Sequence, residues 1–448
     1  MRGDLHATFI EGDPDTGPVF SYDPTRHSRW GFSEFQEEIS VQAPRICCLD
    51  LDTFFVSVER LLDPSLRGKP VVVGGRRGGR GVVTSSSYEA RAFGVRSGMS
   101  IREASKLAPR DAVFVPGHHD LYSDYSARAR EIVERFSPIV IAASIDEHYL
   151  DFSGCERMYR HRDDANDDAT IARVVRDMTA SIDRELGLPA SAGIATSKSM
   201  AKVASGLAKP QGVLLVQAGT EADTLAPLGV RKLPGIGPVA EARLHALGIK
   251  TLGELVIAPE AFLRPIFGSY TSGILRSARG GGNDELGRER PAFREHDPRG
   301  SVAGTISNER TFVESNADTA TAVLSGLAER VASRARHRGV LAGQVTLKLR
   351  YTDFNTINRG RTIEPTNVDF EIHRTVLELY REARTRDLPI RLLGIQIAKL
   401  RLDAVQLPLF DAGERRGAAV DRVRGRFGCD SVHLASTIGR RSRKQTSK

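Results

Sequence analysis

Residues 46–62 read ICCLDLDTFFVSVERLL, and this stretch decides the fold of the first part of the chain. Its first four residues are apolar, as in a buried strand, and the run ends where Asp50 and Asp52 alternate with leucine. From Thr53 to Leu62 the apolar residues return at helical spacing. A strand that leads directly into a helix, repeated along the chain, predicts an α/β or α+β domain with acidic residues at a strand end.

A second acidic stretch, SIDEHYLD at residues 144–151, interrupts the apolar residues of 139–152. Carboxylate oxygens held at strand ends are ligands that suit Mg²⁺. Two such ions about 4 Å apart can activate an attacking 3′-hydroxyl and stabilise a leaving pyrophosphate. Acidic residues at strand ends can also cap helices or stand in solvent. Two segments that each break an apolar run favour the metal site.

The length of 448 residues predicts several domains, and 40% apolar with 27% charged residues is typical of a globular protein. No stretch has the roughly 20 apolar residues that span a bilayer, and no secretory signal is visible at the N-terminus. The four cysteines form no CxxC pair, and Cys47 and Cys48 are adjacent. We therefore expect reduced thiols in a cytoplasmic protein that does not enter a membrane.

The net charge of +8 is unevenly distributed along the chain. Residues 1–43 carry three Arg against eight Asp and Glu, whereas residues 411–448 carry ten Lys and Arg against four Asp and Glu. The residues between them are basic, as suits a polyanionic partner such as nucleic acid. A basic surface that serves solubility alone is the alternative.

The sequence also shows where domains begin and end. Residues 1–43 are rich in Asp, Gly, Pro and Ser and predict a flexible acidic extension. A linker is expected at 280–300, because Gly, Arg, Asp, Glu and Pro dominate there. Beyond it, apolar and polar residues alternate over 345–351, which predicts a strand with one buried and one basic face. Other expected strands are 71–73, 82–84, 190–195 and 393–402, and expected helices are 121–135, 168–186, 198–208, 318–337, 370–385 and 418–427.

The two acidic segments resemble the two catalytic motifs of Y-family DNA polymerases, in the form found in the DinB (polymerase IV) branch. The resemblance implies that Asp50, Asp146 and Glu147 bind two Mg²⁺ ions, with Glu147 in the position treated as catalytic. The backbone carbonyl of Leu51 would complete one metal shell. Asp52 belongs to the motif without being a direct ligand. His148 departs from the pattern, since a small or apolar residue is commoner there, and a change in packing behind the carboxylates is expected.

Residues 85–95, SSSYEARAFGV, place Tyr88 and Arg91 three positions apart on one face of a predicted first helical turn. A phenol and a guanidinium near a helix start can bind phosphates, although an ordinary exposed helix start has the same pattern. The segment resembles the finger motif of the same family. The resemblance implies that Tyr88 and Arg91 hold the incoming triphosphate, with Ser85 as a weaker candidate.

Lys202 and Lys209 lie two helical turns apart, and Lys209 precedes a proline. By resemblance Lys209 reaches the triphosphate, while Lys202 is expected on the helix surface or facing DNA. Phe55 follows Asp50 by five residues and occupies the steric-gate position, where an aromatic ring excludes the 2′-hydroxyl of a ribonucleotide. The alternative is that Phe55 belongs to the core and that Phe54 faces the cleft.

Residues 233–238, LPGIGP, resemble a helix–hairpin–helix, in which Gly235 and Gly237 let backbone N–H groups approach a DNA phosphate. A simple helical turn is the alternative. Lys348 and Arg350 lie on the basic face of the predicted strand and are expected to contact the duplex backbone. This arrangement is similar to the little-finger domain that Y-family enzymes add to palm, fingers and thumb.

The peptide QLPLF at residues 406–410 fits the pattern Q-L-x-L-F. Gln406, Leu407, Leu409 and Phe410 suit a hydrophobic pocket, and in bacterial relatives such a peptide docks on the sliding clamp (beta subunit). A chance apolar run that closes the little finger is the alternative. The peptide departs from the family in position, because 38 residues follow it.

These observations predict an α+β multidomain protein, a right-hand polymerase. Its parts are palm and fingers at 44–226, a helical thumb with the helix–hairpin–helix at 227–290, an α/β little finger at 300–403 and a tail at 404–448. The expected function is template-directed addition of dNTPs to a primer 3′ end in low-fidelity translesion synthesis, by a monomer bound to primer–template DNA. The alternative is a non-catalytic DNA-binding scaffold in a mutagenesis complex, although such a relative would be expected to lose its metal carboxylates. A nucleotidyl cyclase would leave the hairpin and the little finger unexplained.

Overall fold

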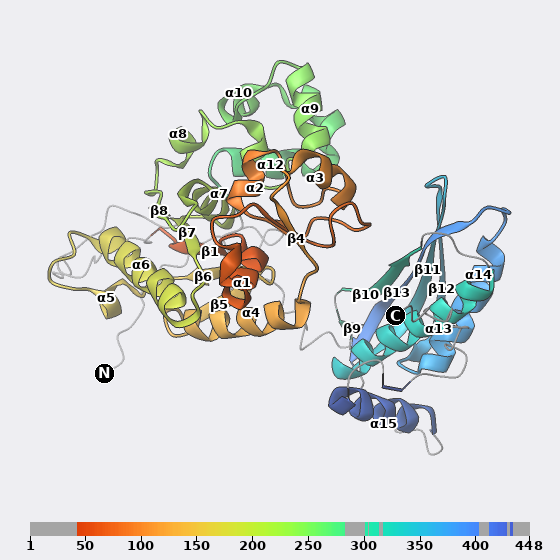
Figure 1. Ribbon diagram of the computed structural model, residues 1–448. Coiled ribbons are helices and arrows are strands. Elements are labelled where there is room, and N and C mark those ends of the chain that lie inside the picture. The colour runs from red at the N-terminus through yellow and green to blue at the C-terminus, as the bar shows by residue number, and fades with distance from the viewer. Residues whose placement is uncertain are drawn as a thin grey trace, which may run out of the picture. The chain divides into compact units, whose positions relative to one another are not determined.

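The chain forms two compact units, Met1–Asp284 and Glu285–Lys448 (Figure 1). The structure, a computed structural model, describes residues 43–282, 301–302, 304–312, 317–402, 412–427 and 431–432. The units divide within the stretch 280–300, where Gly, Pro and charged residues are concentrated.

The first unit is built on a five-stranded sheet with β1 at its centre. β1 (Ile46–Leu51) pairs antiparallel with β6 (Glu147–Asp151) on one side and with β7 (Ala190–Ala195) on the other. The first four residues of β1 are fully buried, as their apolar composition predicts. The outer strands are β5 (Ile139–Ala142) and β8 (Val213–Leu215), in the order β5-β6-β1-β7-β8.

Three helices pack with this sheet around one core, α1 (Phe54–Leu62), α4 (His119–Val133) and α6 (Asp167–Leu186). A fourth helix, α7 (Lys198–Ala208), packs against β7 and β1. α7 lies very close to β7. A Cβ at Gly193 would stand 2.2 Å from the backbone nitrogen of Ser205 and 2.3 Å from the carbonyl oxygen of Ala201. Only glycine fits there, and this close approach brings Lys202 of α7 to Asp50 on β1.

A smaller sheet with its own core follows α1 in the chain. It comprises β2 (Val71–Val73), β3 (Ser85–Ser86) and β4 (Val113–Val115), with α2 (Tyr88–Ala92) and α3 (Ile101–Leu107) beside it. The expected strand at 82–84 is wrong. Val82 makes only an isolated bridge to Ser100, and the residues that pair with β2 are Ser85 and Ser86.

The rest of the first unit is mainly helical, and for residues 227–282 this agrees with the helical thumb expected there. It contains the short turns η1 (Pro64–Leu66), η2 (Val230–Lys232) and η3 (Gly268–Tyr270) and the helices α5 (Glu156–Tyr159), α8 (Glu221–Leu225), α9 (Pro238–Ala246), α10 (Leu252–Ile257), α11 (Glu260–Phe267) and α12 (Thr271–Ala278).

The second unit is a twisted antiparallel sheet with helices packed on one face (Figure 1). Along β11 (Val340–Tyr351) the side chains of Val345, Leu347, Leu349 and Tyr351 are buried, and those between them are partly exposed. This alternation is the one that the sequence predicts. The other strands are β9 (Ser301–Val302), β10 (Ile306–Thr311), β12 (Thr356–Thr366) and β13 (Ile390–Leu402), and the helices are α13 (Ala317–His337), α14 (Asp369–Ala383) and α15 (Ala412–Phe427).

Within the described ranges, no helix is long and apolar enough to cross a membrane. Cys47, Cys48 and Cys155 are free thiols, and all three are buried. Cys429, the fourth cysteine, lies outside the described residues.

Candidate active site

The carboxylates of Asp50 and Glu147 come together through strand register. In the antiparallel pair of β1 and β6, Asp50 lies directly opposite Glu147. Side chains at directly opposite positions have Cβ atoms about 4.5–5.5 Å apart. The two acidic stretches, far apart in sequence, are thus joined at one end of the central strand.

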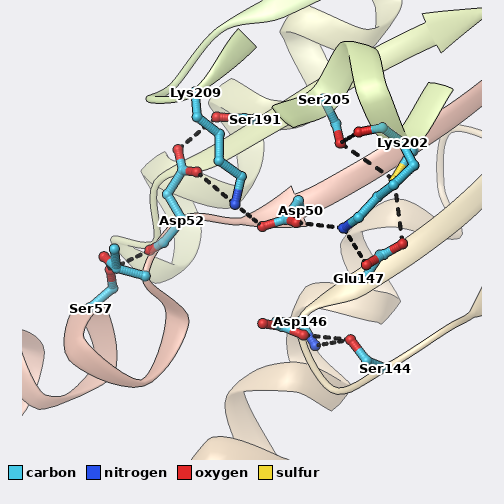
Figure 2. A network of polar contacts seen from close by, with 12 residues as sticks. Asp50, Asp52, Ser57, Ser144, Asp146, Glu147, Ser191, Lys202, Ser205 and Lys209 are labelled. Atoms are coloured by element: carbon cyan, nitrogen blue, oxygen red, sulfur yellow. Dashed lines mark hydrogen bonds and ion pairs between the residues drawn. The ribbon is translucent and has the colours of Figure 1, made fainter. Parts of the chain in front are cut away.

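Two lysines bind these carboxylates (Figure 2). The ammonium group of Lys202 lies 3.0 Å from Asp50 Oδ2 and also bonds Glu147 Oε2, and Lys209 bonds Asp50 Oδ1. Burial alone would lower the pKa of Lys202, but the charge of Asp50 and the bond to Glu147 outweigh it and raise that pKa above its ordinary value. The expectation that Lys202 lies on the helix surface or faces DNA is wrong, because α7 packs close enough to β7 to turn this lysine onto the carboxylates.

Asp146 is not part of this cluster. Its carboxylate accepts a hydrogen bond from the hydroxyl of Ser144, and Figure 2 shows it joined to that residue alone. Among the residues that the structure describes, no group of three or more Asp, Glu, His or Cys side chains is arranged to hold a metal ion. The expected three-carboxylate cluster is therefore not assembled, since Ser144 holds Asp146 and Lys202 bridges the other two. The main chain nevertheless brings Asp146 near, because its carbonyl accepts from the N–H of Leu51 at 2.9 Å.

The chemistry of the donors still fits a divalent cation. Asp50 and Glu147 offer oxygen ligands only, which Mg²⁺ prefers. Both carboxylates already bind a cationic group, and their side chains are 13% and 17% exposed, so ions can reach them. One sulfur lies behind them, that of Cys48, 3.6 Å from Glu147 Oε1, and burial raises the pKa of this thiol to about 12. A protonated thiol is a poor metal ligand.

Asp52 is more deeply buried than Asp50, and only 1% of its surface is exposed. Its Oδ2 accepts from the hydroxyl of Ser191 at 2.7 Å and from the backbone N–H of Gln211 at 2.8 Å. Its Oδ1 lies 3.3 Å from the Tyr88 hydroxyl and 3.5 Å from the Lys209 ammonium. Both oxygens are thus bound by protein donors.

Tyr88 and Arg91 lie side by side on α2, as their spacing predicts. The guanidinium carbon of Arg91 stands 5.1 Å from the centre of the Tyr88 ring, and its Nε donates to the carbonyl of Ser86. Burial and the charge of Asp52 raise the pKa of Tyr88 to about 12, so its hydroxyl remains a donor at neutral pH. Ser85 lies in β3 and is only 7% exposed.

The two phenylalanines of α1 have different surroundings. Phe54 is 2% exposed and belongs to the core. Phe55 is only partly buried and packs against the outside of that core. The Phe55 ring stacks on Tyr122, with centroids 4.2 Å apart and planes inclined by 12°. Tyr122 in turn donates to the buried carboxylate of Glu59, which also lies 2.8 Å from Nδ1 of His118.

His148, the departure from the motif, is 1% exposed, and its Nδ1 has no hydrogen-bond partner. Burial lowers its pKa, so the neutral ring is favoured. It points to the opposite face of β6 from Glu147, since successive strand residues alternate.

The expected DNA contacts lie on both units. Gly235 has φ 94°, which favours glycine, whereas Gly237 has φ −87° and precedes α9. In the second unit Lys348 pairs with Glu309 at 2.7 Å, and the Nε of Arg350 donates to Thr356 at 2.7 Å. The expected clamp residues 406–410 and the acidic residues 1–42 lie outside the described residues.

Sequence reasoning missed the cations on the carboxylates, the contacts of Asp52 and the cluster under Phe55. Glu59 carried the one available signal, a charged residue on the apolar side of α1. Lys202 and Asp50 are 152 residues apart, and no local pattern joins them.

The sequence matches the impB/mucB/samB family over residues 49–206, the C-terminal domain of that family over 304–409 and the IMS family HHH motif over 219–249. A DNA polymerase IV of Dehalococcoides mccartyi (strain CBDB1) is 37% identical over 398 residues, which cover 88% of this chain and 97% of the relative. A DNA polymerase IV of Caulobacter vibrioides is 35% identical, with 89% and 94% covered.

Among solved structures, a chimera of the Y-family DNA polymerases Dbh and Dpo4 is similar with a TM-score of 0.67 at 23% identity, over 80% of this chain and 99% of the chimera. DinB from Sulfolobus solfataricus has a TM-score of 0.54 over the same shares. The expected fold, an α+β multidomain right-hand polymerase, is thereby confirmed. The chain belongs to the impB/mucB/samB family of Y-family DNA polymerases, among the relatives of DNA polymerase IV.

Proposed function

We propose that this chain is a template-directed DNA polymerase that adds deoxynucleotides to a primer 3′ end and copies damaged templates with low fidelity. The observation that carries the proposal is the pair Asp50 and Glu147, opposite each other on β1 and β6. It occurs in a chain similar over almost its whole length to proteins named DNA polymerase IV. A scaffold that only binds DNA would not need this pair.

Asp50, Asp146, Glu147 and the Leu51 carbonyl are proposed to hold the divalent ions, which we take to be two Mg²⁺. When bound, these ions lower the pKa of the primer 3′-hydroxyl and neutralise the leaving pyrophosphate. To hold these ions together with the other carboxylates, Asp146 would leave the Ser144 hydroxyl. Lys202 would then give up its bridge between Asp50 and Glu147.

The chain's own groups bind and orient the incoming nucleotide. Tyr88 and Lys209 meet at Asp52, and Arg91 lies against the Tyr88 ring. Together they offer a hydroxyl, an ammonium and a guanidinium, which suit a triphosphate. Ser85, being buried, would contribute through the backbone at most. Phe55 is proposed to lie under the sugar as the steric gate.

DNA is proposed to be bound without regard to sequence. The N–H groups of the turn at Gly235 and Gly237 can donate to a phosphate, and the exposed face of β11 carries Lys348 and Arg350. In this assignment residues 44–226 form palm and fingers, 227–290 the thumb and 300–403 the little finger. The peptide 406–410 would bind a sliding clamp. We further propose that the protein works as a monomer in the cytoplasm, where DNA and dNTPs are present.

The test is primer extension by the purified chain with Mg²⁺ and four dNTPs. Glu147→Gln removes the charge with little change of shape, and we expect it to slow extension about a hundredfold or more. Glu131→Gln, on the exposed side of α4, is the matched control and should extend normally. Primer–template affinity should be equal in all three proteins.

Two outcomes would reject the proposal. Wild-type protein that binds primer–template but adds no nucleotide would favour the non-catalytic scaffold. Extension by Glu147→Gln at close to the wild-type rate would show that the chemistry lies elsewhere.

A further inference from the structure

Asp52 has a role that its position in the motif does not reveal. A carboxylate that is 1% exposed is unfavourable unless its oxygens are bound, and here each oxygen has two partners. This set leaves little room for a metal ion. Asp52 therefore differs in its partners from Asp50, which lies at the same strand end and pairs with Lys202 and Lys209.

The partners of Asp52 come from separate parts of the first unit. Ser191 lies on β7, Tyr88 on α2 of the smaller sheet, and Lys209 and Gln211 on the turn after α7. Two of these four, Tyr88 and Lys209, are the proposed triphosphate contacts. One buried carboxylate thus joins the groups that must converge on one ligand.

The contacts differ in strength. Ser191 and the N–H of Gln211 bond Oδ2 at 2.7 and 2.8 Å, within the normal range for hydrogen bonds. Tyr88 and Lys209 lie at 3.3 and 3.5 Å, so they are steered by the carboxylate without being held tightly. Tyr88 can therefore turn toward a more strongly charged acceptor such as a triphosphate, and Lys209 would have to leave Asp50 Oδ1 as well to do so.

The turn that carries Lys209 depends on this carboxylate. Gln211 has φ 51°, in the left-handed region that non-glycine residues adopt at a cost. Its N–H is the group bonded to Asp52. A charge-assisted bond to a strained residue fixes the backbone two positions after Lys209.

We propose that Asp52 is a positioning residue for the incoming nucleotide, which holds Tyr88 and the turn of Lys209 in the geometry that receives the triphosphate. The inference rests on the proposed function of those two residues. Because the donors are already gathered by Asp52, less side-chain freedom is lost when the nucleotide binds.

The experiment is steady-state primer extension with varied dNTP concentration. Asp52→Asn keeps the shape but loses the charge that binds Gln211, Tyr88 and Lys209. We expect the KM for dNTP to rise about tenfold and kcat to change less than about threefold, because nucleotide positioning is lost and the metal carboxylates are untouched. Ser57→Ala is the matched control. It removes a 2.8 Å bond to the backbone carbonyl of Asp52, not to its carboxylate, and should leave KM unchanged.

A second variant covers the case in which Asp52→Asn does not fold. Ser191→Ala keeps the negative charge of Asp52 but removes the hydrogen bond to its Oδ2. It should raise the KM for dNTP about twofold to fivefold. In the double variant with Asp52→Asn, the two effects should not add, since both act through one carboxylate.

An unchanged KM in both variants would overturn the inference. A lower KM in both variants would also overturn it, because it would show that Asp52 competes with the nucleotide for these groups. A fall in kcat alone would overturn it too. If the wild-type protein does not extend a primer at all, the proposed function fails, and that result is distinct from any result on KM.

Discussion

Phe54 and Phe55 are adjacent on α1, yet they differ in burial. Phe54 is enclosed by the core, whereas Phe55 is only partly buried against it and stacks on Tyr122. Stacking fixes the plane of the ring, because an offset parallel pair of aromatics resists rotation. The local pattern of α1 alone left both residues possible as the steric gate, and burial favours Phe55.

Replacing Phe55 by Ala should raise incorporation of ribonucleotides while incorporation of dNTPs survives. A 2′-hydroxyl left without a partner costs about 1–3 kcal/mol, so the rNTP/dNTP ratio should rise on the order of tenfold to a hundredfold. The measurement is the ratio of kcat/KM for rNTP and dNTP in single-nucleotide insertion.

Phe54→Ala is the matched control and should lower stability by about 3–5 kcal/mol, with little effect on that ratio. If Phe54→Ala shifts the ratio and Phe55→Ala does not, the gate is Phe54.

The contacts of a single residue could be predicted from the sequence where its partners are close in sequence, and not where they are distant. Tyr88 and Arg91 are neighbours on one helical turn, and their spacing predicted their contact. Asp50 and Glu147 could be singled out by composition, but the lysine between them could not. Lys202 reaches Asp50 only through the packing of α7 on β7, which depends on the close approach at Gly193.

At the scale of elements, α15 is bound to the other helices of the second unit by buried ion pairs between arginine and carboxylate side chains. Arg336 of α13 bonds Asp421 of α15 at 2.7 Å and Asp369 of α14 at 2.9 Å. Arg424 of α15 bonds Glu329 of α13. The side chains of Arg336 and Asp421 are each 10% exposed, so the pair is largely shielded from water.

Removing Arg336 should therefore destabilise the second unit. Arg336→Ala leaves Asp369 and Asp421 without their cation, and loss of one partner of a buried pair costs about 3–5 kcal/mol. The change should appear in urea unfolding followed by circular dichroism. Arg416→Ala, on the exposed side of α15, should change the midpoint little. Equal midpoints for both variants would mean that α15 is not bound to α13 and α14 in solution.

Elements with a clear period could be predicted from the sequence, and others could not. β7 was expected at 190–195 and lies at Ala190–Ala195, and α13 and α14 begin within one residue of their expected starts. β12 escaped prediction, since TINRGRTIEPT is polar and contains glycine and proline. It is an edge strand, and its place depends on pairing with β11 rather than on its own composition.

For the whole molecule, the basic charge predicts how DNA affinity responds to salt. Each phosphate contact releases counterions, so the logarithm of the binding constant should fall linearly with the logarithm of salt concentration. Arg350→Ala, on the exposed face of β11, should reduce this slope by about one. Fluorescence anisotropy with labelled primer–template over a salt series measures it.

Arg381→Ala, on an exposed position of α14, is the matched control and should keep the wild-type slope. A salt-independent affinity, or a strong preference for one duplex sequence, would contradict binding through the phosphate backbone.

The central position of β1 has a consequence for hydrogen exchange. β1 is bonded on both sides, to β6 and β7, and its first four residues are fully buried. Amides in such a strand exchange with solvent only when the surrounding unit opens as a whole. The smaller sheet, next to the helix α2 that carries Tyr88, has three short strands and its own core, so it can open first. Deuterium should then enter the segment of Tyr88 long before it reaches the strand of Asp50, and the carboxylate pair would stay protected longer than the segment that is proposed to bind the triphosphate.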